Sequence, residues 1–292
     1  MFEGVLIKAY GGFYYVKKGD EIWECSLRGK FRLGKDTPAL VGDRVMITPI
    51  KENVGRIDEV LPRKTELFRP AVANIDQAVI VFAVQNPEPN PTLLDRFLVL
   101  AETAEIAPLV CLNKGDLLTG RRDHEWLRLY KKIGYPTVIA STKKGEGIDE
   151  LRQLLVGKTS VFAGPSGVGK SSLLNAVQPG LELKTGDISH KLKRGKHTTR
   201  HVELLPLNNG GYVVDSPGFS SLDLPQMNKE DLCYYFPEFA TFISECKFNG
   251  CLHHHEPQCA IKDAVEKGLI DKERYQNYLA FLLEILQQER RY

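Results

Sequence analysis

The chain of 292 residues lacks several features that would place it in a specialised class of protein. No stretch approaches the roughly 18 consecutive apolar residues of a membrane-spanning helix, and the N-terminus has no basic head followed by an apolar run. The net charge is only +2, so any affinity for nucleic acid must come from local basic patches. These absences favour a cytoplasmic protein with no membrane partner, and 42% hydrophobic residues suit a folded core.

The first part of the chain, residues 1–65, is expected to form a small β-barrel. Short segments at 4–10, 13–17, 21–27, 44–48 and 54–61 predict five strands, with a tight turn at Gly11 and Gly12. An OB-type barrel is the leading interpretation, and a barrel of the SH3 type is the alternative.

The second part, residues 66–222, alternates buried strands with helices. Continuous apolar runs at 78–84, 108–112, 137–140 and 160–163 are typical of strands covered on both faces. Asn90 followed by Pro91 predicts the start of a helix between the first two runs. We therefore expect a parallel α/β sheet in a multidomain chain, with residues 223–292 as a third domain that includes an amphipathic helix.

A phosphate-binding loop follows the run at 160–163 and precedes a helix. Its glycines let backbone N–H groups turn toward phosphate oxygens, and the helix N-terminus adds partial positive charge. We expect Lys170 to reach the β- and γ-phosphates as a catalytic residue and Ser171 to bind Mg²⁺. The nucleotide-binding residues of this loop are Gly164, Pro165, Ser166, Gly167, Val168, Gly169, Lys170, Ser171 and Ser172.

A second motif is expected to select the base of the nucleotide. It consists of Asn113, Lys114 and Asp116, which directly follow the apolar run at 108–112. A carboxylate at Asp116 can accept hydrogen bonds from the N1–H and 2-amino groups of guanine. Adenine offers neither donor, which argues against an ATP-using protein. Asn113 would brace the loop, and the stem of Lys114 would lie along the base. A second base-contacting loop is expected at Ser141, Thr142 and Lys143, with an ordinary strand-to-helix loop as the alternative.

Other residues are expected to contact the γ-phosphate and its metal ion. Asp215 can hold Mg²⁺ through a water, and Gly218 can donate its N–H to the γ-phosphate. One hydroxyl in the segment 195–199 should complete the Mg²⁺ shell, and Thr199 is favoured over Thr198 as this ligand.

One further absence concerns catalysis. Many GTPases place a glutamine directly after the glycine that corresponds to Gly218, and this glutamine orients the attacking water. This chain has Phe219 at that position. We therefore expect slow intrinsic hydrolysis and a partner that completes the site. His197 is the internal candidate to position the water, and a solvated or RNA-facing histidine is the alternative.

A cluster of cysteine and histidine near the C-terminus predicts a metal site. Cys246, Cys251, His253 and Cys259 supply three thiolates and one imidazole, a closed tetrahedral set that suits one structural Zn²⁺ ion. His254 and His255 are alternative imidazole ligands, and free cysteines beside solvated histidines are the alternative to a metal site.

The motifs appear in an unusual order. In a Ras-like GTPase the P-loop comes first, whereas here Asn113 and Ser141 precede Gly164, which precedes Thr199 and Asp215. The order is a circular permutation of the Ras-like order, in which the chain termini lie at a different point. The loops still follow strands of one parallel sheet, so all of them lie at the same edge of that sheet. The chain in this respect resembles the RsgA/YjeQ/YloQ family of circularly permuted GTPases, and the resemblance extends to residues 28–32, residues 195–199 and the cysteine cluster.

This resemblance implies an N-terminal OB-fold, a permuted GTPase domain, a zinc domain, and stimulation of GTP hydrolysis by the 30S subunit in its late maturation. It also implies contacts with 16S rRNA, and the sequence contains two basic patches that could make them. We expect the protein to be a monomer. The alternative is a GTP-dependent binding switch for a non-ribosomal RNA or protein partner. The patches comprise Arg28, Lys30, Phe31, Arg32 and Lys35, and then Lys191, Lys193, Arg194, Lys196 and Arg200.

Overall fold

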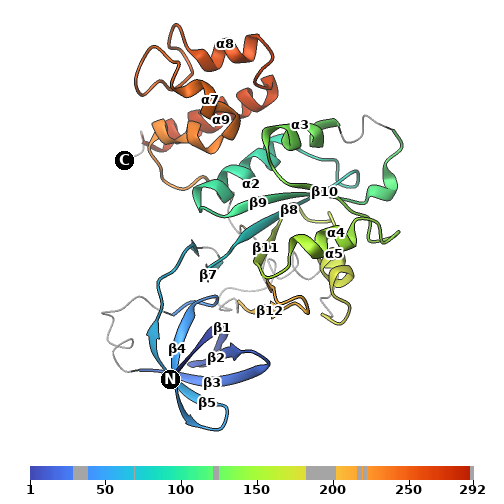
Figure 1. Ribbon diagram of the computed structural model, residues 1–292. Helices are drawn as coiled ribbons and strands as arrows, with labels where there is room; N and C mark the ends of the chain where they lie inside the picture. Colours follow the sequence, from blue (N-terminus) through green and yellow to red (C-terminus); the bar gives the residue numbers. More distant parts are fainter. Residues whose placement is uncertain are drawn as a thin grey trace.

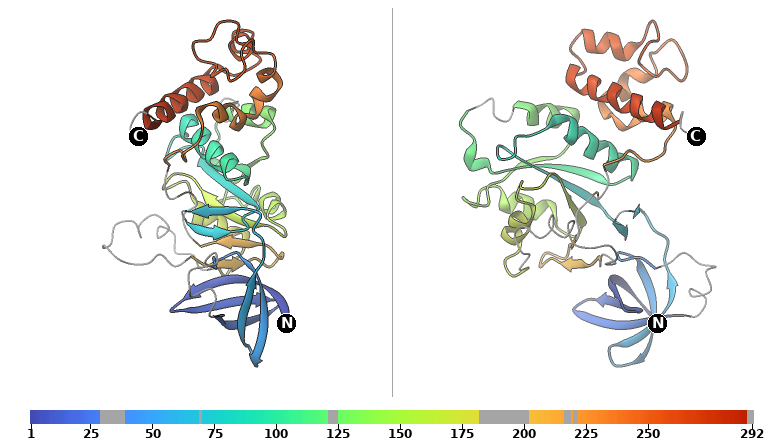
Figure 2. Two further views of the ribbon diagram at one scale, coloured as in Figure 1. Left: turned by 90° about the vertical axis from the view of Figure 1, so that its left-hand side faces the viewer. Right: turned by 180° about the vertical axis from the view of Figure 1, so that it is seen from behind.

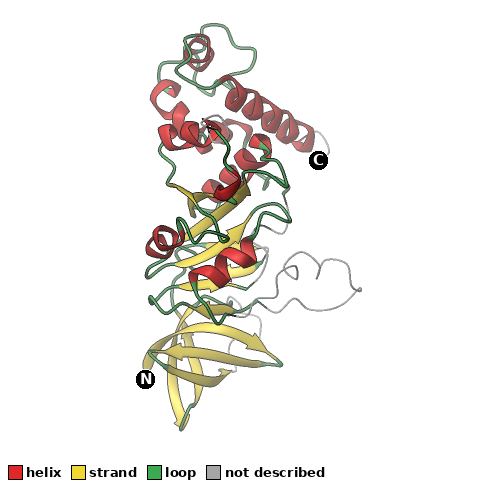
Figure 3. Cartoon of the chain, turned by 90° about the vertical axis from the view of Figure 1, so that its right-hand side faces the viewer, coloured by secondary structure: helices red, strands yellow, loops and turns green. Residues whose placement is uncertain are grey.

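The computed structural model describes residues 1–28, 39–68, 70–120, 125–181, 202–215, 219 and 222–289. A β-barrel, an α/β core and a small helical part follow one another along the molecule, so that the two termini lie at opposite ends (Figure 1 and Figure 3). No helix in these ranges is long and apolar enough to cross a membrane.

The N-terminal part is a closed barrel with the strand order β1-β2-β3-β5-β4. β3 pairs with β5 in parallel, and the other pairs are antiparallel, which is the OB-type arrangement and not the SH3 alternative. Alternate residues such as Val45 and Ile47 fill the interior. The strands are β1 (Phe2–Tyr10), β2 (Phe13–Lys18), β3 (Glu21–Leu27), β4 (Arg44–Lys51) and β5 (Val54–Val60).

A short antiparallel pair, β6 (Glu66–Phe68) and β7 (Ala71–Ala73), connects the barrel to the α/β core. The sequence pattern did not indicate this pair. Arg63 anchors the connection, because its guanidinium donates to both carboxylate oxygens of the buried Asp43, at 2.7 and 2.8 Å.

The core is a six-stranded sheet with the order β10-β9-β8-β11-β13-β12, in which only β12 runs antiparallel to its neighbour. Every residue of β8 is buried, as expected for an apolar strand covered on both faces. The strands are β8 (Gln77–Ala83), β9 (Ala107–Asn113), β10 (Thr137–Ile139), β11 (Thr159–Ala163), β12 (Leu204–Pro206) and β13 (Tyr212–Val214).

Helices cover both faces of this sheet (Figure 1). Ile80 and Phe82 pack against one pair of helices, whereas Val79 and Val81 pack against the other pair. Asn90 caps α2 as predicted, since its side chain accepts a hydrogen bond from the N–H of Leu93 at 3.0 Å. The first pair is α2 (Pro91–Thr103) and α3 (Glu125–Ile133), and the second is α4 (Ile148–Leu154) and α5 (Lys170–Val177).

The C-terminal part is helical. Its long helix begins at Lys272, directly after Asp271, which accepts hydrogen bonds from the N–H groups of Glu273 and Arg274. Tyr278 and Leu282 of this helix are buried in a separate hydrophobic core. The elements are the 3₁₀ helices η4 (Lys229–Tyr235) and η5 (Pro237–Phe239) and the helices α7 (Ala240–Ile243), α8 (Ala260–Glu266) and α9 (Lys272–Glu289).

A buried ionic network joins this C-terminal part to the α/β core. The side chain of Arg274 on α9 is 2% exposed, and it binds Asp95 of α2 at 2.6 Å and Glu238 of η5 at 2.7 Å. Tyr130 of α3 and Asn277 of α9 also donate hydrogen bonds to Asp95, at 2.7 and 2.6 Å. Burial raises the pKa of Asp95, and the positive charge of Arg274 opposes this shift.

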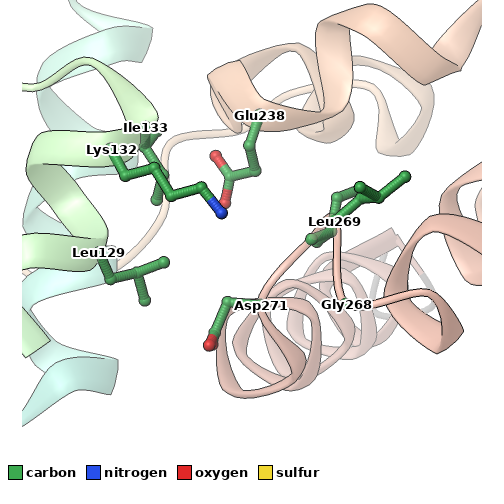
Figure 4. Close-up of a pocket in the computed structure, with 8 residues that line it drawn as sticks. Leu129, Lys132, Ile133, Glu238, Gly268, Leu269 and Asp271 are labelled. Atoms are coloured by element: carbon green, nitrogen blue, oxygen red, sulfur yellow. The ribbon is translucent and has the colours of Figure 1, made fainter.

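A small pocket lies beside this network, between α3 and the loop that precedes α9 (Figure 4). Leu129 and Lys132 line it from α3, and Leu269 and Asp271 line it from the loop. Glu238, which also binds Arg274, closes the pocket on a third side. The pocket therefore belongs to the joint between two parts of the chain, and the nucleotide motifs lie elsewhere.

Candidate functional site

The strand order brings the predicted nucleotide motifs to one edge of the sheet. The loops that begin at Asn113, Ser141, Gly164 and Asp215 follow β9, β10, β11 and β13, which run parallel to one another. In open parallel sheets, ligands bind at this carboxyl edge. The permuted order along the chain therefore leaves the spatial arrangement of the loops intact.

The P-loop needs glycine where it passes close to other backbone. Gly164 has a φ of +133°, and a Cβ atom there would lie 2.1 Å from the carbonyl oxygen of Val81. Gly169 has a φ of +92°, and a Cβ atom there would lie 2.4 Å from Nδ2 of Asn113. Glycine at these two positions therefore follows from the positive φ angles and from the contacts with β8 and with Asn113, the first residue of the predicted base-specificity loop (residues 113–116).

Lys170 folds back onto its own loop. Its Nζ donates hydrogen bonds to the carbonyl oxygens of Gly164 at 2.9 Å and Pro165 at 2.7 Å. Burial lowers the pKa of Lys170 to about 8. Ser171 is buried at the start of α5, directly after this lysine.

Asn113 joins the base-specificity loop to the P-loop. Its Nδ2 donates a hydrogen bond to the carbonyl oxygen of Val168 at 2.8 Å, and both side chains are buried. Lys114 adopts a left-handed backbone conformation with a φ of 61°, and its Nζ contacts the carbonyl oxygen of Asn86. The loop before α2 thus also approaches the site, which the sequence motifs did not indicate.

Asp116 is held in place by the neighbouring loop. The hydroxyl of Ser141, which is fully buried, donates a hydrogen bond to Oδ1 of Asp116 at 2.7 Å. This bond is the main reason why the pKa of Asp116 is lowered, and Lys143, with Nζ 4.0 Å from Oδ2, acts in the same direction. The segment that begins at Ser141 therefore adjoins the loop of Asp116 and lowers the pKa of its carboxyl group.

The residues predicted to contact the γ-phosphate and its metal ion are described only in part. Asp215 directly follows β13, and its N–H donates a hydrogen bond to the carbonyl oxygen of Glu203 at 2.8 Å. His197, Thr198, Thr199 and Gly218 lie outside the described residues.

Phe219 occupies the sequence position of the missing glutamine, and its ring packs against apolar side chains. Its ring packs 6.1 Å from the ring of Phe97 on α2, and it contacts the hydrophobic clusters of both the α/β core and the C-terminal part. An apolar ring offers no hydrogen bond to an attacking water.

The four predicted metal ligands converge at the C-terminal part. The Sγ atoms of Cys246 and Cys259 are 3.9 Å apart, and Nδ1 of His253 lies 3.5 and 3.4 Å from them. A tetrahedral zinc ion holds thiolates at about 2.3 Å, which separates two sulfurs by about 3.8 Å. With Cys251 included, all ligand atoms lie within 4.8 Å of one another, so the cluster fits a metal ion.

His253, and not its neighbours, is the imidazole of this cluster. His253 is 1% exposed and directs Nδ1 at the sulfurs, whereas the rings of His254 and His255 contact each other, with centroids 3.5 Å apart and planes tilted by 31°. Tyr275 supports the ligand loop by donating its hydroxyl hydrogen to the carbonyl oxygen of His253 at 2.7 Å. Tyr278 does the same at Leu252, at 2.9 Å. The amphipathic pattern of the C-terminal helix gave no signal for these contacts of the tyrosine hydroxyl groups.

Comparisons with known proteins agree with this architecture. The family model described as RsgA GTPase matches residues 60–225, and the one described as RsgA N-terminal domain matches residues 3–57. A protein of Moorella thermoacetica named small ribosomal subunit biogenesis GTPase RsgA is 51% identical over 99% of this chain and 99% of its own length. A protein of the same name from Alkaliphilus metalliredigens is 49% identical over 100% of both chains.

Solved structures give the same answer. The crystal structure of YjeQ from Thermotoga maritima superimposes with a TM-score of 0.87 at 42% identity, covering 97% of this chain and 98% of that one. The structure of YloQ, described as a circularly permuted GTPase, superimposes with a TM-score of 0.84 at 41% identity, covering 98% and 95%. The chain therefore belongs to the RsgA family and is a GTPase.

Proposed function

We propose that this GTPase acts on the small (30S) ribosomal subunit during its late maturation, and that the subunit stimulates GTP hydrolysis through contacts that include 16S rRNA. The names of full-length relatives support a role in ribosome biogenesis. The main observation behind the proposed partner is Phe219. At the position where a glutamine would orient the attacking water, this chain has an apolar ring packed against Phe97, so a partner has to complete the site.

The roles of individual residues are part of this proposal. Asp116 recognises guanine, Lys170 and the P-loop hold the phosphates, and Ser171 and Thr199 bind Mg²⁺. Asp215 binds the same ion through a water. The domain limits that we propose are 1–65, 66–222 and 223–292.

The deciding experiment is GTP hydrolysis with no ribosomal particle, with purified 30S subunits and with 50S subunits. We expect stimulation by 30S subunits alone. His197→Ala should then reduce the stimulated rate more than the intrinsic rate, and unchanged stimulated turnover would remove His197 from the mechanism. Absence of stimulation by 30S subunits would favour a binding switch for another RNA or protein.

The pKa of Lys170 predicts how nucleotide binding depends on pH. Above pH 8 the free protein holds this lysine largely neutral, whereas bound phosphates favour its ammonium form. Binding must then take up a proton, so affinity should fall as pH rises above 8, by up to about tenfold per pH unit. Calorimetry of GDP binding in buffers of different ionisation enthalpy measures this uptake. Lys170→Met should bind more weakly and show less uptake, and equal uptake by both proteins would contradict the assignment.

We propose that the metal is one structural Zn²⁺ ion, because the cluster offers no open position for a water. Cys259→Ser should reduce the metal content from about one zinc per chain to well below that. Elemental analysis of the purified protein measures this. Cys233→Ser is the matched control, since Cys233 is buried in the same core but belongs to no ligand set in the described residues. Equal zinc content in both variants would exclude Cys259 as a ligand.

A further inference from the structure

The barrel contacts the α/β core next to the strand that leads to Asp215. Lys8 of β1 and Glu203, the residue before β12, form an isolated antiparallel bridge. Nζ of Lys8 lies 2.8 Å from Oε2 of Glu203, and the two side chains are 38% and 33% exposed. Figure 1 and Figure 2 show β1 and β12 side by side where the barrel meets the core.

The backbone of Glu203 is also hydrogen-bonded to Asp215, the residue proposed to bind Mg²⁺ through a water. The carbonyl oxygen of Glu203 accepts the hydrogen bond from the N–H of Asp215 at 2.8 Å. The pKa of Lys8 is raised chiefly by its hydrogen bond to Glu203, with a smaller contribution from the negative charge of Asp215. Glu203 therefore contacts both the barrel, through its side chain, and Asp215, through its backbone.

Apolar packing fixes the joint beneath the ion pair. Ile7 of the barrel is 5% exposed and belongs to the same hydrophobic cluster as Leu204 and Val214, which flank this backbone pair. A displacement of the barrel at this joint must therefore move Glu203 or strain its packing, because well-packed interiors transmit strain.

We propose that Lys8 and Glu203 are positioning residues for GTP hydrolysis, through which the barrel sets the backbone that presents Asp215 to Mg²⁺. The inference rests on the proposed role of Asp215. It assigns the barrel a part in the reaction itself, in addition to any contact with RNA, because the barrel supplies one of the groups that hold the Mg²⁺ side in place.

Turnover at varied Mg²⁺ concentration tests the inference without ribosomes. Lys8→Met and Glu203→Gln should each lower kcat, and raise the Mg²⁺ concentration for half-maximal rate, by roughly two- to fivefold, the range for a partly exposed ion pair. The KM for GTP at saturating Mg²⁺ should change by less than about twofold. The charge exchange Lys8→Glu with Glu203→Lys should restore most of both losses.

Glu3→Gln is the matched control. This variant breaks the ion pair between Glu3 and Arg44, which lies within the barrel. Nε of Arg44 is 2.6 Å from Oε1 of Glu3, and the side chains of Glu3 and Arg44 are 43% and 50% exposed. This variant should leave the Mg²⁺ dependence unchanged. GDP affinity measured without Mg²⁺ checks that each variant is folded, because the base and P-loop contacts do not use the ion pair.

Two outcomes would overturn the inference. One is an unchanged Mg²⁺ dependence in folded Lys8→Met and Glu203→Gln, and the other is a loss that the charge exchange does not restore. Asp215→Asn should shift the Mg²⁺ requirement more than either single variant, and if it does not, the assignment beneath the inference fails. Stimulation of the unaltered chain by 30S subunits tests the proposed function separately.

Discussion

Replacing Asp116 with asparagine is expected to weaken GTP binding by roughly 10²–10⁴-fold and to favour xanthine nucleotides instead. The carboxylate accepts a hydrogen bond from Ser141, which lowers its pKa, and is proposed to accept two charge-assisted hydrogen bonds from guanine. Each such bond contributes about 1.5–3 kcal/mol, and about 1.4 kcal/mol corresponds to a factor of ten in affinity. An asparagine amide at this position can donate to the 2-oxo group of xanthine.

Titration of a fluorescent GTP analogue and of its XTP counterpart measures this exchange. Glu146→Gln is a suitable control, because Glu146 is an exposed carboxylate in the neighbouring loop and pairs only loosely with Lys144, at 4.0 Å. The control should keep the affinity and preference of the unaltered chain. If Asp116→Asn still prefers GTP over XTP by the original ratio, the assignment of the base-specificity loop is wrong.

Arg274→Met is expected to destabilise the joint between α9 and α2 by about 3–5 kcal/mol, because it leaves the carboxylate of Asp95 buried without its cation. Arg96→Met is the comparison, since Arg96 joins the same two helices through Glu284 but is 21% exposed. Its cost should stay within about 1 kcal/mol. Adding Asp95→Asn to Arg274→Met should recover part of the loss, because the amide carries no charge.

Tryptophan fluorescence during urea unfolding can follow this joint. Trp126 lies on α3 with its ring 6.0 Å from Tyr130, which donates to Asp95. The other tryptophan, Trp23, lies in the barrel and can be replaced by phenylalanine to leave a single reporter. Equal urea midpoints for Arg274→Met and Arg96→Met would show that the buried network adds no more than this partly exposed ion pair.

Local pattern was enough to predict much of the fold. The apolar run at 78–84 indicated a strand buried on both faces, and Asn90 with Pro91 indicated the start of α2. Such signals depend on neighbouring residues only, so one sequence contains them. The P-loop and the residues from Asn113 to Asp116 were identified for the same reason, because each motif is a short segment directly after a strand.

The contacts between distant segments could not be predicted. Arg274 lies on a helix that is amphipathic overall, where an arginine normally faces solvent, and its partner Asp95 is 179 residues away. His253 was predicted as the zinc ligand with His254 and His255 as alternatives, and the structure confirms that His253 joins the cluster. The alternatives stayed open because the choice depends on how the loop turns between Cys251 and Cys259. The pair of Lys8 with Glu203 also gave no local signal.

The network around Arg274 also limits how this chain can diverge. Asp95, Glu238 and Arg274 lie on three elements, and a change in the charge of one leaves the others unbalanced in a buried place. We expect these positions to co-vary among relatives. For the same reason, a chimera that takes the metal-binding part from a relative should fold well only if it takes the matching α2 too. The C-terminal part is therefore not an independent module, and its hydrophobic core also includes Val99 and Leu100 of α2.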